Sequence, residues 1–367
     1  MEKTDSEVPN SSDNRPDVTT EQLNNIDATS NFMLHPQQPA LILAPMEGVT
    51  DAPMRAVQGA AGVFTYAVTE FLRVTQHVPP KHVFADHMPE LSTGCRTPTG
   101  LLVQLQLLGG DAARMAETAA RAHELGATAI DINFGCPART VNRHDGGAAL
   151  LRFPNRVREI VAAIRAALPA AVPVSAKLRL GWDTIDAIDE NAAMAAEGGA
   201  SWIAIHGRTR VAGYAPPIFW APIGRVRERL KLPVIANGDI WTLSDFRRCR
   251  EETGCIHYML GRGAIGDPRL ARRVAAELGL LPPVPEGHPT QPFDWLPPLR
   301  SLVEWSERFE ETQSQKMVSR LKQWLKTAAT VGTFSRFDAI KRASTVEELF
   351  ATLEIPTETS TSFAFRK

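Results

Sequence analysis

The sequence predicts an α/β fold, namely a (β/α)8 TIM barrel followed by a smaller all-α helical domain. Three observations support this prediction. Eight short runs of apolar and β-branched residues lie between residues 41 and 260, and segments with helical spacing separate most of them. The region after about residue 290 shows helical spacing alone. A doubly wound parallel sheet is the alternative for the first part, because it also alternates strands and helices.

The predicted strands and helices follow one another with turn residues between them. The strands are expected at 41–44, 64–69, 101–108, 129–134, 174–180, 202–206, 233–236 and 255–260. The helices are expected near 51–60, 111–125, 154–168, 183–198, 218–230, 242–252 and 266–279. The helix from Pro154 is typical, with proline in its first turn and Val157, Ile160, Val161 and Ile164 on one face. The connection 71–100 is expected to be irregular.

Composition also divides the chain into regions. Residues 1–38 are rich in Asn, Ser, Asp, Thr and Pro, so we expect a disordered leader. The barrel is predicted to span 39–285. A proline-rich linker begins at Pro282, a helical domain is expected at 290–355, and 356–367 reads as a polar tail.

Charge and cysteine usage exclude several classes of protein. Lys and Arg number 40 against 41 Asp and Glu, so a polyanionic partner needs a local basic patch. No run approaches 18 apolar residues and no apolar segment follows the amino terminus, so we expect no membrane span and no secretion signal. The four cysteines lie far apart without a CxxC pair, which favours a reducing cytoplasm and no metal site.

Polar residues follow or end nearly every predicted strand. In a TIM barrel the active site lies at this end of the strands, so these residues are the candidates for chemistry. The glycine-bearing turns after the seventh and eighth strands are where such barrels often bind phosphate. In chain order the candidates are Pro45, Met46, Glu47 and Gly48; Glu70; Gln106; 133–137; Lys177 and Arg179; His206; Asn237, Gly238 and Asp239; and Gly261, Arg262 and Gly263.

Two cations lie within an otherwise apolar strand. Lys177 and Arg179 are two residues apart, so their side chains are expected on the same side of the strand. A cation that points into a barrel requires an anionic partner, such as a phosphate or an electron-rich flavin ring. The alternative is that both side chains point outward into solvent.

Cys136 is the candidate for proton transfer. It lies in a Gly-Cys-Pro turn after the fourth strand, near Arg139, Arg143 and His144, where a thiol could reach a substrate. His144 is a second candidate for proton transfer or a phosphate contact. The other three cysteines, Cys95, Cys249 and Cys255, are expected to be inert core residues.

The helical region contains one segment with a cationic face. Between residues 316 and 328 the apolar residues Met317, Val318, Leu321, Trp324, Leu325 and Ala328 share one arc. The opposite arc carries Lys316, Arg320, Lys322 and Lys326 with no acidic residue among them. This pattern favours a surface for a nucleic-acid backbone first and for acidic lipid second.

Seven motifs in order resemble the tRNA-dihydrouridine synthase family over about residues 41–350. They are 43–51 (LAPMEGVTD), 69–73 (TEFLR), 104–107 (QLQL), 131–137 (DINFGCP), 177–182 (KLRLGW), 206–209 (HGRT) and 237–239 (NGD). Within that family the sequence is most similar to bacterial subfamily C, on residues 70–74, 140–142, 179–183 and 320–325.

This resemblance implies an FMN-bearing barrel, a helical tRNA-binding domain, NADPH as reductant, and uridine 16 of the D-loop as target. It implies that Cys136 is the catalytic acid. The implied cofactor-binding residues are Pro45, Met46, Glu47, Gln106, Lys177, His206, Asn237, Gly238, Asp239, Gly261 and Arg262. Those implied to face the tRNA or its base are Arg73, Asn133, Arg179 and Tyr214, and the helical domain adds Lys316, Arg320 and Lys322.

The expected protein is therefore a cytoplasmic flavoenzyme, taken as a monomer without a metal or a membrane partner. Three alternatives stay open. The enzyme could act at another D-loop position, it could be an FMN barrel reductase of a small molecule, or the chain could be an RNA-binding protein without catalysis. A small-molecule reductase would not need the cationic helical domain, and a binding protein would not need Lys177, His206 and a phosphate cradle in one barrel.

Overall fold

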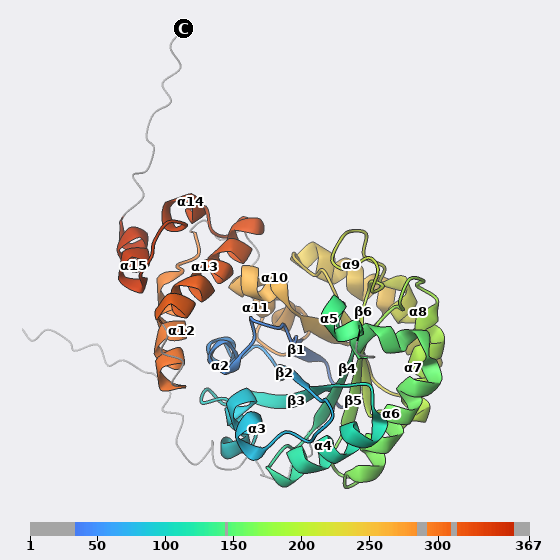
Figure 1. Ribbon diagram of the computed structural model, residues 1–367. Coiled ribbons are helices and arrows are strands. Elements are labelled where there is room, and N and C mark those ends of the chain that lie inside the picture. Colours follow the sequence, from blue (N-terminus) through green and yellow to red (C-terminus); the bar gives the residue numbers. More distant parts are fainter. Residues whose placement is uncertain (1–33, 144–145, 285–291, 310–313, 356–367) are drawn as a thin grey trace, which may run out of the picture.

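Eight parallel strands close into a barrel in the computed structural model, which describes residues 34–143, 146–284, 292–309 and 314–355 (Figure 1). Each strand pairs with the next along the chain, and β1 also pairs with β8, so the sheet has no free edge. The barrel prediction is confirmed and the doubly wound sheet is excluded. The strands are β1 Ala40–Leu43, β2 Tyr66–Arg73, β3 Leu102–Leu108, β4 Ile130–Phe134, β5 Val174–Arg179, β6 Trp202–His206, β7 Val234–Asn237 and β8 His257–Leu260.

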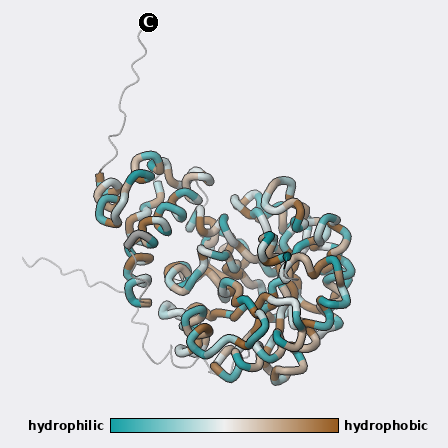
Figure 2. The backbone as a smooth tube through the Cα atoms, in the orientation of Figure 1, coloured by the Kyte–Doolittle hydropathy of each residue, from teal (hydrophilic) through white to brown (hydrophobic). Residues whose placement is uncertain are grey.

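Helices cover the outside of the barrel, and each predicted one is present. They are α2 Ala52–Ala60, α4 Ala112–Glu124, α6 Pro154–Ala167, α7 Ala187–Glu197, α8 Ala221–Arg229, α9 Leu243–Thr253 and α11 Pro268–Glu277. Figure 2 shows hydrophobic and hydrophilic stretches alternating along them, as expected for helices that bury one face. Five short helical segments were not predicted: the helices α3 Lys81–His87, α5 Arg139–Asn142 and α10 Arg262–Gly266, and the 3-10 helices η1 Pro89–Thr93 and η2 Gly147–Arg152.

The second strand is longer than predicted. The pattern placed it at 64–69 with an irregular connection from residue 71, whereas β2 continues to Arg73. Its pairing with β3 shifts register between Val68 and Phe71, and the Thr69 hydroxyl accepts the hydrogen bond of the Gln106 amide at 3.0 Å. A side chain thus replaces a backbone carbonyl at this bulge, which the alternation of residues alone did not reveal.

The barrel interior divides into an apolar and a polar part. Ala40, Ile42, Tyr66, Val68, Trp202, Ala204, Ile235 and Met259 form one buried apolar cluster. The inward positions of β3, β4 and β5 carry instead Gln104, Gln106, Asp131, Asn133, Ser175, Lys177 and Arg179, which contact one another. Buried polar groups are costly unless hydrogen-bonded, so this half of the interior is built for more than packing.

The helices after residue 292 form their own apolar cluster beside the barrel (Figure 1). They are α12 Leu296–Arg308, α13 Ser314–Thr330, α14 Phe337–Ile340 and α15 Val346–Glu354. The predicted apolar arc of α13 is buried at Met317, Val318, Leu321, Trp324, Leu325 and Ala328. Met54 and Val57 of α2 and Ile265 of α10 join this cluster, and the Trp324 indole donates to the carbonyl of Ile265 at 2.8 Å.

Some expectations fall on residues that the structure does not describe. These are the leader up to residue 33, the tail 356–367, part of the proline-rich linker, and His144. Among the described residues no helix is long and apolar enough to cross a bilayer. No three His, Cys, Asp or Glu side chains gather there as metal ligands.

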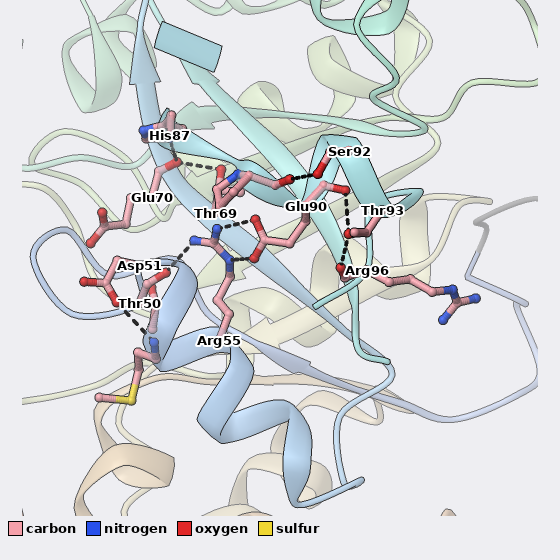
Figure 3. Close-up of polar contacts among 12 residues, drawn as sticks. Thr50, Asp51, Arg55, Thr69, Glu70, His87, Glu90, Ser92, Thr93 and Arg96 are labelled. Atoms are coloured by element: carbon pink, nitrogen blue, oxygen red, sulfur yellow. Dashed lines mark hydrogen bonds and ion pairs between the residues drawn. The ribbon is translucent and has the colours of Figure 1, made fainter. Parts of the chain in front are cut away.

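A buried ion pair fixes α2 against the segment after β2 (Figure 3). The Arg55 guanidinium donates to both carboxylate oxygens of Glu90, at 2.8 and 2.7 Å, and to the carbonyl of Thr50 at 2.9 Å. Both side chains are about 1% exposed. Because α2 follows β1 and also contacts α12, this pair helps position the loop after β1 at the mouth of the barrel.

We predict that Glu90→Gln destabilises the protein by about 3 kcal/mol, since it leaves a buried guanidinium without its counter-charge. The matched control is Glu117→Gln, which breaks the exposed Arg114–Glu117 pair and should cost about 0.5 kcal/mol or less. Urea unfolding followed by circular dichroism measures both. Equal losses in the two variants would contradict the structural role of the buried pair.

Candidate active site

A cavity of about 340 Å³ opens at the carboxyl ends of the strands. Every strand, or the loop that follows it, contributes to its wall, and the volume suits a cofactor or nucleotide-sized ligand. The residues predicted from strand ends and from the resemblance that line it are Pro45, Met46, Glu47, Glu70, Gln106, Asn133, Gly135, Cys136, Pro137, Lys177, Arg179, His206, Tyr214, Asn237, Gly238, Asp239, Gly261, Arg262 and Gly263. The candidate Gly48 does not line it. The structure therefore brings these side chains together, while their individual roles stay predictions.

Asp131 is the centre of a hydrogen-bond chain beneath the cavity floor. Its buried carboxylate accepts from Gln106 Nε2 at 2.6 Å and from the Ser175 hydroxyl. Gln104 in turn donates to Ser175 Oγ at 2.9 Å. Burial raises the pKa of Asp131, and the hydrogen bonds from Ser175 and Gln106 oppose that rise. The carboxylate orients Gln106, whose Oε1 then accepts from Asn133 Nδ2 at 2.8 Å.

Asn133 connects this hydrogen-bond chain to the turn that carries Cys136. Its Oδ1 accepts from the backbone amides of Gly135 and Cys136 at 2.9 and 2.8 Å. The Cys136 carbonyl accepts from the Ala148 amide at 3.2 Å and from Asn142 Nδ2 at 3.3 Å. The cysteine is thus held on both sides of its peptide unit. Burial raises the pKa of its thiol, so the group is protonated at neutral pH.

Lys177 lies in the cavity wall opposite an amide. Its Nζ donates to Asn237 Oδ1 at 2.9 Å, and Asn237 Nδ2 donates to the carbonyl of Met259 at 2.8 Å. Burial, with Arg179 nearby, lowers the pKa of Lys177 to about 8, while Asp131 acts in the opposite direction. Both Lys177 and Arg179 line the cavity, so the outward alternative for this strand is wrong.

Arg179 joins the Cys136 turn to the loop after β6. Its Nε donates to the carbonyl of Gly135 at 2.7 Å, and its Nη1 donates to the carbonyls of Thr209 and Gly213 at 3.1 and 2.7 Å. Its guanidinium carbon lies 5.2 Å from the centre of the Tyr214 ring. Through these contacts Arg179, like Asn133, holds the cavity wall in place. The sequence predicted only that the two residues face the tRNA or its base.

The turns after β7 and β8 form a positively charged corner. Gly238 has a φ of +114°, and a Cβ there would lie 2.7 Å from the Ile218 side chain. Asp239 forms ion pairs with the buried Arg208 and, at 2.9 Å, with Arg262. The Arg262 guanidinium carbon lies 4.6 Å from the Tyr214 ring centre and 4.9 Å from that of Trp241. Two guanidiniums share one carboxylate, so the corner keeps a net positive charge.

His206 stands between these cations. Burial lowers the pKa of its ring well below the usual value, and the charges of Arg179, Lys177, Arg208 and Arg262 add to that effect. The imidazole is therefore neutral. Its Nδ1 is buried and has no hydrogen-bond partner among the described residues, and neither has Nη1 of Arg208.

Those unpartnered groups fit a flavin mononucleotide. A buried polar atom without a partner is costly, so the cavity is unfinished without a ligand. A ligand that carries a phosphate and hydrogen-bonding ring atoms would meet the cationic corner, the His206 ring and the Lys177 amine. The chemistry of the residues present thus agrees with the cofactor class that the resemblance implies.

Acidic groups gather on the side of β1 and β2. Glu70 Oε1 accepts from the Val49 amide at 3.0 Å. His87, beside Glu70 in Figure 3, contacts the Glu70 carbonyl at 2.8 Å. Burial, together with Asp51 and Glu47, raises the pKa of Glu70 to about 7. The sequence placed Glu70 after the strand, but it lies within β2 at the bulge. It still lines the cavity.

The four residues predicted to bind tRNA from outside the cavity come from two elements, the end of β2 and the helix α13. Arg73 is exposed at the end of β2, 6.0 Å from the ring of Phe71, which lines the cavity. Lys316 is exposed on α13. Arg320 instead pairs with Asp51, the residue that caps α2.

Lys322 donates to the carbonyls of Lys341 and Ala343. The prediction of a uniform cationic face on α13 is therefore corrected. The acidic partner of Arg320 comes from a segment 269 residues away in the chain, where periodicity cannot find it.

Sequence reasoning missed three site residues. Asp131 and Ser175 are inward strand residues below the cavity, and Asn142 holds the Cys136 carbonyl from the following turn. A signal was available in the spacing. Asp131 and Asn133, like Ser175 and Lys177, are two residues apart on a strand, so their side chains point to the same side. Polar residues at such paired positions indicate an internal network.

The free energy of unfolding should reveal the burial of Lys177. Its pKa is lower in the folded chain than in the unfolded one, so folding releases a proton between about pH 8 and 10.5. Below pH 8 the buried amine is charged, and its burial lowers the free energy of unfolding. Lys177→Met should therefore be more stable than the natural protein at pH 7, and this advantage should shrink as the pH rises to 10.5. Denaturant unfolding of both proteins across this range tests the sign. An advantage that is absent or grows with pH would contradict it.

The comparisons with known proteins agree with this site. The family description "Dihydrouridine synthase (Dus)" matches residues 42–345. The tRNA-dihydrouridine(16) synthase of Shewanella oneidensis is 44% identical over 285 residues, which are 77% of this chain and 87% of that protein. The protein of the same name from Pseudomonas putida is 44% identical over 78% of this chain and 86% of its own length. The protein of the same name from Neisseria meningitidis serogroup B is 37% identical over 87% of this chain and 96% of its own length.

Among solved structures, a 2-naphthoyl-CoA reductase complex has a TM-score of 0.50 and 12% identity, over 65% of this chain and 50% of that one. At that identity the likeness shows the barrel fold alone. The family match and the relatives together cover the barrel, the Cys136 turn and most of the helical region. The chain therefore belongs to the dihydrouridine synthase family, flavin-dependent oxidoreductases that reduce uridine in tRNA to dihydrouridine.

Proposed function

We propose that this enzyme reduces uridine 16 in the D-loop of tRNA to 5,6-dihydrouridine, with FMN as cofactor and NADPH as reductant. The relatives that carry the name tRNA-dihydrouridine(16) synthase support the target position. The cationic corner at Arg208 and Arg262 supports a phosphorylated flavin. We further propose that the enzyme acts as a monomer in the cytoplasm.

The observation that carries this proposal is the position of the Cys136 thiol. Reduction of the C5–C6 double bond of uracil needs a hydride at one carbon and a proton at the other. Reduced FMN, held by the residues that line the cavity, would supply the hydride for C6. The Cys136 thiol, which is protonated before the reaction, delivers the proton to C5.

The cavity residues divide into two sets in this proposal. Those proposed to hold the cofactor are Pro45, Met46, Glu47, Gln106, Lys177, His206, Asn237, Gly238, Asp239, Gly261 and Arg262. Lys177, which lines the cavity, would supply positive charge that stabilises the anionic reduced cofactor. Arg262, oriented by Asp239, neutralises the phosphate, and the buried Arg208 on the other side of Asp239 adds positive charge to this corner.

The second set receives the nucleotide. A base stacked in tRNA cannot reach the barrel mouth, so the uridine has to be extruded. Tyr214, half exposed beside Arg179 and Arg262, offers an aromatic face at the entrance. Asn133 and Arg179 present their remaining N–H groups to the polar edge of the base, and Arg73 contacts the tRNA beside it.

Cys136→Ala separates the two half-reactions. The variant should take electrons from NADPH at the natural rate, because the thiol has no part in that step. Its reoxidation by tRNA should slow by about 100-fold or more, since a positioned acid contributes that much. Stopped-flow absorbance of the flavin measures both rates.

Cys95→Ala is the matched control, because Cys95 is buried away from the cavity. If Cys136→Ala formed dihydrouridine as fast as the natural enzyme, the thiol would have no part in the mechanism. Reoxidation of the natural enzyme by free uridine as fast as by tRNA would instead favour a small-molecule reductase.

The helical region makes a separate prediction. Lys316 and Lys326 are exposed on α13, so replacing both by Gln should weaken tRNA binding and lower its dependence on salt. Fluorescence titrations at several salt concentrations measure this. An unchanged affinity would show that these two lysines are only solvated. Lys322→Gln should in addition lower stability, because Lys322 bonds two backbone carbonyls.

A further inference from the structure

Two arginines contact one tryptophan beside the mouth of the cavity. The guanidinium carbon of Arg210, in the loop after β6, lies 4.6 Å from the ring centre of Trp182, in the loop after β5. That of Arg152, at the end of η2, lies 5.4 Å from the same ring. We call Arg152, Trp182 and Arg210 the arginine rim.

The arginine rim is held rigidly to the cavity. The amides of Arg210 and Val211 donate to the carbonyls of Gly181 and Trp182, both at 2.9 Å, so the two loops are joined by backbone hydrogen bonds. Arg179 then ties the same β6 loop to the cavity wall through the carbonyls of Thr209 and Gly213. A surface ordered in this way can bind a ligand without a large cost in loop entropy.

The positive charge of the rim has no counter-charge within the described part of the chain. Neither Arg152 nor Arg210 forms an ion pair there, and Asp183, next to Trp182, forms none with them. Two arginines on the outer helices are paired instead: Arg225 with Asp186, and Arg247 with Glu277. Two like charges held against one ring repel each other, so this surface favours an anion.

Apolar groups accompany these charges. Phe153, 5.6 Å from the Arg152 guanidinium carbon, is 45% exposed, and Val211 is 61% exposed. A surface with arginines and exposed apolar side chains suits RNA, whose phosphates are anionic and whose unpaired bases and riboses pack on apolar faces.

The rim also lies across the mouth from the helical region. The helical region contacts α2, which follows β1, and α10, which follows β8. In a closed barrel of eight strands in order, β5 is opposite β1 (Figure 1). An RNA that enters the cavity between these sides would meet positive charge on both.

We propose that the arginine rim binds the sugar-phosphate backbone of the tRNA next to the extruded nucleotide, as a second RNA contact apart from the helical region. This inference rests on the proposed function, since it takes the substrate to be tRNA. Arg152 and Arg210 each neutralise a phosphate, and Trp182 keeps the two guanidiniums in place.

The test is the salt dependence of tRNA binding by the double variant Arg152→Gln/Arg210→Gln. Losing two phosphate contacts should lower the slope of log K against log salt by about 1.4, at about 0.7 for each contact with single-stranded RNA. The double variant Arg152→Lys/Arg210→Lys should keep the natural slope, because it keeps both charges. The outer-helix variant Arg225→Gln/Arg247→Gln is the matched control and should also keep it.

Flavin reduction by NADPH in the rim variant should equal that of the natural enzyme, which shows that the barrel is intact. A natural salt slope in Arg152→Gln/Arg210→Gln, or an equal loss in the outer-helix control, would overturn the rim while leaving the proposed function standing. A natural enzyme that neither binds nor reduces tRNA would overturn both.

Discussion

The buried carboxylate of Asp131 is the constraint on which the site depends. It lies inside the barrel, where an acidic group persists only if its oxygens are hydrogen-bonded, and Gln106 and Ser175 meet that need. Gln106 donates to Asp131 through its Nε2, which leaves its Oε1 to accept from Asn133 and so to orient it. Asn133 in turn fixes the backbone of Cys136. A polar core therefore sets the position of the thiol at the barrel mouth.

Charge is separated across the same mouth. Cations occupy the side of β5 to β8, and the acids Glu47 and Glu70 occupy the side of β1 and β2. Burial, with the neighbouring cations adding to it, lowers the pKa of Lys177 and leaves His206 neutral. Buried cations of this kind lower the stability of the fold, and an anionic cofactor would relieve that cost.

The local pattern of the sequence predicted most of this fold. Strand and helix periods located all eight strands, and the position of polar residues at the strand ends identified most of the cavity residues. Contacts between distant segments were beyond it. The bulge in β2 depends on the Thr69 hydroxyl replacing a ladder bond to β3, and Arg320 is drawn from the expected cationic face by Asp51. The spacing of Asp131 and Asn133 indicated that both point into the barrel. It could not indicate that Asp131 is bonded by Gln106 and Ser175, which lie on other strands.

The most direct measurement is a map of dihydrouridine in a tRNA that lacks it, after incubation with the purified protein, FMN and NADPH. The account predicts dihydrouridine at position 16 of the D-loop and unchanged uridine elsewhere. Modification at a different position would contradict the proposed target. A tRNA that stays unmodified while the bound flavin is reduced normally would contradict the claim that this cavity acts on tRNA.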